Sequence, residues 1–191
     1  MLGTGVASPG LLQYLIRANH SSVLEHASIS VLISGVSRSF LAQITRHRMA
    51  SYTSASQHYQ DYSNYENIVH PDLDNNETVM LSLEQTDIDY RQLVSEGVPI
   101  YAARQVLPNA KAVNILWTIN ARSLWNFLNI RLCKRNVPEM LNFAYVMQSV
   151  AKQWWEDLFI WSGPDCEVWG QCRQGRMMAE ECKGSKQIKL I

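Results

Sequence analysis

The pattern of hydrophobic and polar residues predicts helices and strands that alternate along the chain. Residues 27–36 alternate between the two kinds and are rich in β-branched side chains, as expected of a strand. A second strand is expected at residues 112–119. Helical spacing of apolar residues, together with Ser8 and Asn120 as N-cap residues, predicts helices at about 9–18, 39–48, 77–95, 99–106, 120–134 and 138–161.

These elements predict the fold class α+β, in which helices pack on a small, mostly antiparallel sheet. A length of 191 residues suits one domain with a sizeable core. We therefore expect residues 1–191 to form a single catalytic domain, with 162–191 as a cysteine-containing C-terminal tail. The last predicted helix is rich in tryptophan and other apolar residues, which suggests that another subunit covers part of its surface.

Composition narrows the choice of function. Charged residues make up 18% of the chain and the formal net charge is zero, which argues against a general nucleic-acid binder. No apolar run approaches the roughly 20 residues of a membrane span, and the first residues lack the pattern of a secretion signal. Four cysteines are too few for a disulfide framework in a chain of this size. We expect a cytoplasmic protein without nucleic-acid or membrane partners.

The densest group of candidate functional residues begins with Arg46, His47 and Arg48, which are followed by small hydroxyl and aromatic residues up to Tyr59. Three such side chains repel one another unless anions lie nearby, and the planar fork of arginine suits phosphate oxygens. An alternative is that these cations simply end a helix, where they interact favourably with its dipole.

A second group lies on the predicted helix that begins after Asn120. Arg122, Asn126 and Asn129 are spaced at i, i+4 and i+7, so they share one face of the helix. Amide groups both donate and accept hydrogen bonds, which matches the edge of a flavin or a pyrimidine. A merely solvated face would be expected to carry lysine and glutamate instead.

These segments resemble the flavin-dependent thymidylate synthase family, whose signature is an Arg-His-Arg triplet, seven residues and a serine. The chain has this triplet at 46–48 and the serine at Ser56. Residues 120–131 are similar to the family's Asn-x-Arg-Ser-Leu … Phe-Leu-x-x-Arg block, and residues 20–26 to its His-x-Ser/Thr-x-x-Glu-His pattern. The resemblance covers roughly residues 8–160.

The resemblance implies C5-methylation of dUMP to dTMP, with FAD as cofactor and with NADPH and methylenetetrahydrofolate as co-substrates. It also implies a homotetramer whose sites combine residues from several subunits. The residues it implies for the flavin are His20, Ser22, Arg46, His47, Arg48, Thr53, Asn120 and Asn126. Those it implies for the nucleotide are Gln43, Ser54, Ser56, His58, Arg104 and Arg131.

Two of these residues, Arg131 and Ser56, are the catalytic candidates. Negative charge builds on the pyrimidine when its C5 attacks, and a fixed arginine in the place of Arg131 stabilises that charge. Ser56 is expected to position the nucleotide and not to act as a nucleophile. No cysteine lies in a convincing nucleophile context, which fits a flavin route.

No metal site is expected. The spacing of Cys166, Cys172 and Cys182 is not that of a zinc site, and their role does not follow from the sequence. Glu25 lies beside His26 and near His20, but no further ligand motif follows.

The chain departs from the family pattern in its nucleotide loop. Thr53, Ser54 and His58 stand where the family commonly has a polar residue, glutamate and arginine, and histidine is a weaker, pH-dependent cation. Family members also have a strand before the first helix. Three alternatives therefore stay open: a flavin-dependent C5-methylase for UMP or another uridine nucleotide, a non-catalytic flavin- or nucleotide-binding paralogue, and a helical interaction module without cofactor.

Overall fold

The computed structural model describes residues 9–18, 20–168, 170 and 172. The chain divides into two compact units, a central unit of Ser30–Thr118 and a flanking unit made of the segments up to Ile29 and from Ile119 onward. The predicted N-cap Ser8 and Cys182, with most of the expected tail 162–191, lie outside the described residues. The single catalytic domain stays a prediction.

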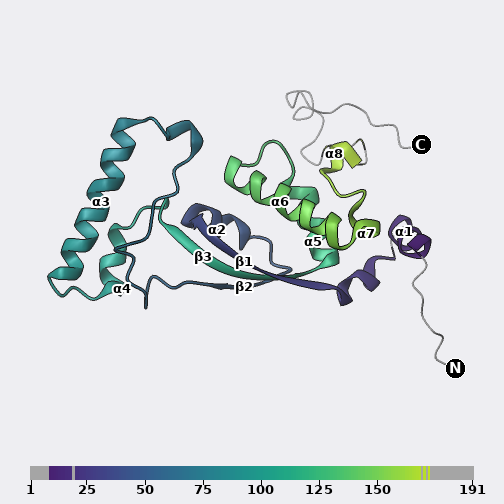
Figure 1. The fold of residues 1–191 in the computed structure, drawn as a ribbon, viewed down its shortest axis with the longest axis horizontal. Coiled ribbons are helices and arrows are strands. Elements are labelled where there is room, and N and C mark those ends of the chain that lie inside the picture. The colour runs from purple at the N-terminus through teal and green to yellow at the C-terminus, as the bar shows by residue number, and fades with distance from the viewer. Residues whose placement is uncertain (1–8, 19, 169, 171, 173–191) are drawn as a thin grey trace. The chain divides into compact units, whose positions relative to one another are not determined.

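The central unit is built on a three-stranded sheet with the strand order β1-β3-β2 (Figure 1). β1 spans Ser28–Ser37, β2 spans Ser51–Ser54 and β3 spans Ala112–Asn120. Both predicted strands are confirmed within one residue at each end. The short β2 was not predicted as a strand.

The sheet is antiparallel. β2 pairs antiparallel with β3, with Thr53 opposite Leu116. Between β1 and β3, the side-chain oxygens of Ser30 and Thr118 lie 2.8 Å apart, and Gly35 donates its backbone N–H to Asn114 Oδ1 over 3.1 Å. The partners of β1 and β3 thus run in opposite directions, which confirms the expected α+β class with a small antiparallel sheet.

The helices of the central unit lie before β2 and between β2 and β3. The longest, α3, follows the N-cap Asn76, whose side chain accepts from Val79 N over 3.1 Å. α3 runs alongside α4 and η3 (Figure 1). The bounds are Arg38–Ile44 for α2, Pro71–Leu73 for η2, Glu77–Ser95 for α3, Ile100–Ala103 for α4 and Arg104–Val106 for η3.

The helix predicted at 39–48 ends four residues early, so the prediction that the basic triplet belongs to a helix is wrong. α2 ends at Ile44, and the next residues close a tight turn in which His47 N donates to Ile44 O over 3.0 Å. Thr45 at the C-cap donates its hydroxyl to Leu41 O over 2.8 Å, an alternative to continuing the helix.

The flanking unit is helical apart from the strand ends that enter it. Its helices are α1 (Pro9–Arg17), η1 (Ser21–His26), α5 (Ala121–Arg131), α6 (Pro138–Trp154), α7 (Glu156–Phe159) and α8 (Asp165–Val168). α6 packs on α5 and on α7, and α5 packs on η1 (Figure 1). The buried side chains of α5 include Leu124, Phe127 and Leu128, as the apolar pattern predicts.

Two predicted helix ends in this unit are wrong. The last long helix does not continue to residue 161, because Trp155 adopts φ −139° and ψ 55° and interrupts it between α6 and α7. α5 ends at Arg131 instead of about residue 134. Asn136 then donates its amide to the carbonyls of Ile130 and Cys133, which satisfies acceptors that a helix end leaves open.

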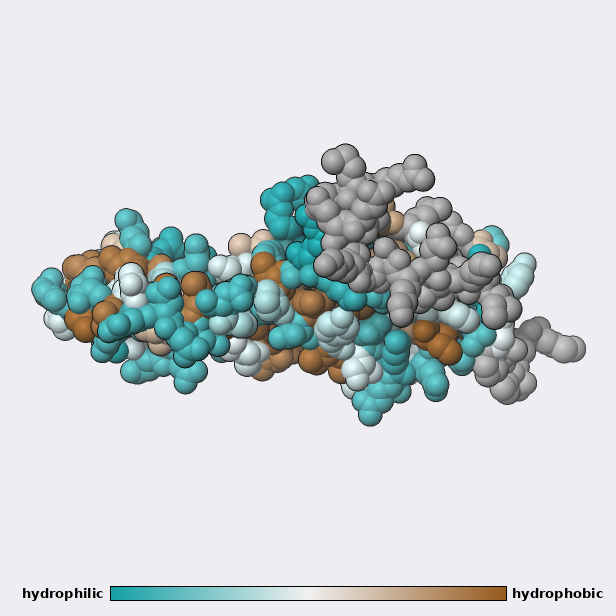
Figure 2. Space-filling model, turned by 90° about the horizontal axis from the view of Figure 1, so that it is seen from above, coloured by the Kyte–Doolittle hydropathy of each residue, from teal (hydrophilic) through white to brown (hydrophobic). Residues whose placement is uncertain are grey.

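Both units expose large apolar side chains. Leu32 on β1 is 71% exposed, and Trp154 at the end of α6 is 62% exposed. In Figure 2, hydrophobic side chains lie among hydrophilic ones at the left of the view, where the central unit carries α3 and α4. Within the described part of the chain, no helix combines the length and the apolar character that a membrane crossing requires.

Candidate functional site

The basic triplet occupies the turn between α2 and β2, and a tyrosine from β2 holds this turn. Tyr52 donates its hydroxyl to the carbonyls of Ile44, over 2.8 Å, and of His47, over 2.6 Å. His47 is buried, whereas Arg46 and Arg48 on either side of it are exposed. The turn therefore presents two guanidinium groups to solvent.

The loop after β2 brings two candidate nucleotide residues to one surface. His58 stacks on Tyr101, with ring centroids 5.3 Å apart and an interplanar angle of 25°. Tyr101 lies on α4, three residues before Arg104, so successive helical turns carry both residues. Ser56 Oγ accepts from His58 N over 3.2 Å, which fixes the loop locally. Ser54, Ser56, His58 and Arg104 are exposed.

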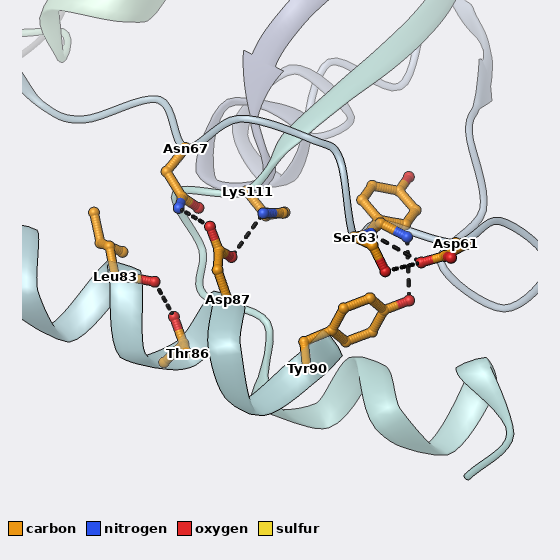
Figure 3. Close-up of polar contacts among 9 residues, drawn as sticks. Asp61, Ser63, Asn67, Leu83, Thr86, Asp87, Tyr90 and Lys111 are labelled. Atoms are coloured by element: carbon orange, nitrogen blue, oxygen red, sulfur yellow. Dashed lines mark hydrogen bonds and ion pairs between the residues drawn. The ribbon is translucent and has the colours of Figure 1, made fainter. Parts of the chain in front are cut away.

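Two buried tyrosines anchor this loop to α3. Tyr90 of α3, which Figure 3 labels, accepts from Tyr62 N over 3.1 Å. Tyr62 donates its hydroxyl to Ala55 O over 3.3 Å. Burial is the main cause that raises the pKa of Tyr62 and of Tyr90. Beside them, the side chain of Ser63 donates to Asp61 over 2.6 Å, and this bond is the largest of the effects that lower the pKa of Asp61.

A second anchor is an ion pair between α3 and the start of β3 (Figure 3). Lys111 Nζ lies 2.7 Å from Asp87 Oδ1, and Asn67 donates its side-chain amide to Asp87 Oδ2 over 2.8 Å. The backbones of Asn67 and Lys111 also form an isolated β-bridge. The segment after β2 is thus tied to α3 at two points, Tyr62 and Asn67, which positions the loop that carries His58.

The flanking unit contains a cavity of about 460 Å³ between α5 and the segment of α1 and η1. The apolar side chains Ile16 and Leu24 form part of its wall. The other residues that line it are Arg17, Ser21, Arg122, Trp125, Asn126 and Asn129. The amide-rich face predicted for this helix therefore lines a cavity, in which Arg122 is exposed and Asn129 is buried.

Neighbouring contacts orient the groups in this cavity. Arg122 forms an ion pair with Glu25 of η1, and Arg17 lies over the ring of Trp161, 5.3 Å from its centroid. The Asn129 amide donates to Gly163 O over 2.8 Å and accepts from Trp125 Nε1 over 3.2 Å, in the orientation that satisfies both partners. The cavity thus combines two guanidinium groups, amides and an indole ring, a set that suits an anionic, aromatic ligand.

Arg131 ends α5 and is partly buried. Its Nη1 donates to Asn136 Oδ1 over 3.4 Å, and Asn136 donates in turn to the carbonyls of Arg131 and Cys133 over 3.1 and 3.2 Å. Asn136 therefore both caps the helix and offers the guanidinium an acceptor.

The candidate residues form two groups, one in each unit. The central unit carries Gln43, Arg46, His47, Arg48, Thr53, Ser54, Ser56, His58 and Arg104, and the flanking unit carries His20, Ser22, Asn120, Asn126 and Arg131. Asn120 caps α5 by accepting from Ser123 N over 2.9 Å, as predicted. The exposed His20 and Ser22 do not line the cavity.

Two polar residues that line the cavity, Arg17 and Ser21, were not predicted as site residues. Arg17 ends α1 and Ser21 begins η1, and their contribution depends on how these helices pack against α5. The i, i+4, i+7 spacing did signal Arg122 and Asn129. Among the described residues, no group of three or more histidine, cysteine or acidic side chains is placed to hold a metal ion.

Comparisons with known proteins show to which family the chain belongs. The family model described as "Thymidylate synthase complementing protein" matches residues 4–156. The flavin-dependent thymidylate synthase of Clostridium tetani is 35% identical over 199 residues, which cover 94% of this chain and 80% of the relative. Those of Geobacter sulfurreducens and Pyrococcus furiosus are 36% and 33% identical and cover 94% and 91% of this chain, and 78% and 75% of the relatives. The match spans the basic triplet, the loop after β2 and α5, and the chain therefore belongs to the thymidylate synthase complementing protein family.

Proposed function

We propose that this protein is a flavin-dependent thymidylate synthase that methylates C5 of dUMP to give dTMP. The observation that carries the proposal is the cavity beside α5, where Arg122, Asn126 and Asn129 meet inside the segment that matches the family. The relatives' name includes a flavin as cofactor and a thymidylate product, and a uridine nucleotide is the corresponding substrate. FAD as the flavin, NADPH and methylenetetrahydrofolate as co-substrates, and a cytoplasmic location are further parts of the proposal.

The residues around the cavity fit part of a flavin nucleotide. Arg17 and Arg122 offer charge to its phosphates, and the amide of Asn126 offers both a donor and an acceptor to the edge of a ring. When bound, the flavin supplies the reducing chemistry of the methylation. His20, Ser22 and Asn120 are the other flavin residues that we propose in the flanking unit, and Arg46, His47, Arg48 and Thr53 those in the central unit.

Arg131 is the proposed catalytic residue. Its fixed charge stabilises the negative charge that develops on a uracil carbonyl and N3 when C5 attacks. Asn136 holds the guanidinium from the side of the helix end, so that less reorganisation is needed during the reaction. Ser56 is the residue that we propose to position the nucleotide. Its Oγ accepts from the backbone N–H of His58, and this bond holds the loop that carries both residues.

The nucleotide phosphate is proposed to bind beside His58 and Arg104. The stacking of His58 on Tyr101 holds the imidazole against the helical segment that carries Arg104, which supplies a permanent charge. Gln43 and Ser54 complete the proposed nucleotide residues in the central unit.

A homotetramer with sites built from several subunits is part of the same proposal. The exposed Leu32 and Trp154 support it, because large apolar side chains at a surface often mark subunit contacts. The test is to mix two inactive variants, Arg46→Ala and Arg131→Ala. Shared sites predict that the mixture regains activity after reassembly, whereas sites contained within one subunit predict that it does not.

The experiment that tests the activity is tritium release from 5-tritiated dUMP, and in parallel from 5-tritiated UMP, with FAD, NADPH and methylenetetrahydrofolate. Release from dUMP alone supports the proposal. Release mainly from UMP would favour a methylase for another uridine nucleotide, which the substitution at His58 makes the second candidate. A flavin-binding protein that releases tritium from neither nucleotide would be a non-catalytic paralogue, and a protein that binds no flavin would be an interaction module.

A further inference from the structure

Three of the chain's four cysteines line one small cavity in the flanking unit. Cys133 follows the end of α5, Cys166 lies on α8, and Cys172 follows α8. The cavity has a volume of about 60 Å³, which corresponds to roughly two water molecules. The cysteine after α5 and the cysteines on and after α8 thus line the same cavity. The remaining residues of its wall are Asn129, Ile130, Pro164 and Asp165.

The three cysteines are free thiols and only partly exposed. Burial is the largest cause that raises the pKa of the Cys166 thiol, and the negative charge of Glu167 is the second. Ionised Cys133 and Cys172 raise it further, and the effect of Cys133 is the larger of these two. Both neighbours are thus near enough to oppose ionisation of Cys166.

We propose that Cys133 and Cys166 are a redox-responsive pair that forms an intramolecular disulfide with a small oxidised disulfide, such as glutathione disulfide, as the oxidant. The Cys133 thiolate attacks one sulfur of glutathione disulfide, whose S–S bond breaks and releases one glutathione thiolate. Cys166 then loses its proton to solvent and attacks the sulfur of Cys133, which displaces the second glutathione thiolate. Two protein thiols are oxidised and one glutathione disulfide is reduced to two thiols, so atoms and electrons balance.

The pair connects two segments that already contact each other. Asn129 on α5 donates to Gly163 O over 2.8 Å, and Gln148 on α6 donates to Ser162 O over 2.6 Å. These bonds hold the segment before α8 against the helices, so little chain entropy is lost when the disulfide closes. Pairing Cys166 with Cys172 would instead link two positions of the same segment.

The pair also lies beside the proposed catalytic residue. Cys133 O accepts from the Asn136 amide over 3.2 Å, and Asn136 is the acceptor for Arg131. A disulfide at Cys133 therefore tightens the turn that holds Arg131. This consequence, unlike the disulfide itself, rests on the proposed function.

The test uses the full-length protein with Cys182→Ser, so that its only cysteines are the three around the cavity. The protein is equilibrated with graded ratios of reduced and oxidised glutathione, free thiols are alkylated, and the peptides are identified by mass spectrometry. The expected product joins Cys133 to Cys166 and leaves Cys172 alkylated. Adding Cys172→Ser should preserve this product, and adding Cys166→Ser should abolish it.

Two results would overturn the proposal: complete alkylation of Cys133 and Cys166 at every ratio, or a product that joins Cys166 to Cys172. The formation rate should rise from pH 7 to pH 9, because the raised pKa of Cys166 keeps it protonated at the lower pH. Binding of dUMP is then measured for the reduced and oxidised forms. Absence of binding in both forms would count against the proposed function and would leave the mapped disulfide intact.

Discussion

Breaking the ion pair between α3 and β3 should destabilise the protein in an asymmetric way. Lys111 is 1% exposed and Asp87 is 18% exposed, with Nζ and Oδ1 2.7 Å apart. Asp87→Asn leaves an ammonium group in a buried place without its counter-ion. Lys111→Met leaves a carboxylate that water reaches in part and that still accepts from Asn67 over 2.8 Å.

The expected magnitudes follow from this difference in burial. Loss of one partner of a buried pair costs about 3–5 kcal/mol, and we expect Asp87→Asn in that range. Lys111→Met should cost about 1–3 kcal/mol, because the stranded carboxylate keeps a hydrogen bond and some hydration. The double variant Asp87→Leu/Lys111→Met leaves no buried charge without a partner. Its free energy of unfolding should lie within about 1 kcal/mol of the wild-type value.

The assay is urea unfolding followed by tryptophan fluorescence, at one protein concentration because assembly shifts apparent stability. Trp117 is buried in the same unit and reports on it. Asp72→Asn is the matched control, since this carboxylate is 87% exposed beside His70 and its loss should change the free energy of unfolding by less than about 0.5 kcal/mol. The reasoning would be refuted by an equally small effect of Asp87→Asn, or by a double variant as unstable as that single one.

Three further predictions concern the proposed site and its anchors. His58→Arg should lower the KM for dUMP, because arginine adds a permanent charge and a planar fork that suits phosphate oxygens; an unchanged or higher KM would count against a phosphate contact. Asn136→Ala should lower kcat/KM about tenfold, and Asn136→Asp, which keeps an acceptor for Arg131, should lower it less; equal losses would show that only the helix cap matters. Burial raises the pKa of Tyr62 above 10.0, so the folded state favours the neutral phenol. The contribution of this group to the stability of the folded state is fully present below about pH 10, and it is lost as the pH rises through the raised pKa. Tyr62→Phe should therefore show a smaller alkaline loss in urea unfolding, and an identical loss would contradict this account.

Capping residues and hydrophobic periodicity predicted the helices and strands whose ends are set by neighbouring residues. The 77–95 helix was correct at both ends, because Asn76 caps α3 through Val79 N. The early end of α2 depends on hydrogen bonds from Thr45 and Tyr52 to carbonyls of its last turn, and α6 is interrupted by the backbone conformation of Trp155; hydrophobic periodicity contains neither signal. The four-residue β2 forms only because β3 offers it a partner.

The candidate site divides in the same way. Helical spacing was sufficient to place Arg122, Asn126 and Asn129 on one face, because that face belongs to one element. Arg17 reaches the same cavity from another helix, which sequence spacing cannot encode. The stacking of His58 on Tyr101 likewise joins residues more than forty positions apart, and no local sequence pattern predicts it.

The division of the chain has a consequence for the order in which the protein folds during synthesis. The central unit is one continuous segment, Ser30–Thr118. Its sheet can form once this segment and the adjoining ends of β1 and β3 have left the ribosome. The flanking unit must wait, because Ala27 O accepts from Ala121 N over 2.8 Å and η1 packs on a helix made much later. Closing so long a loop is entropically costly and slow unless its interior is already compact. Early folding of the central unit would bring the two ends of that loop closer together. The entropic cost of closing the flanking unit would then be lower.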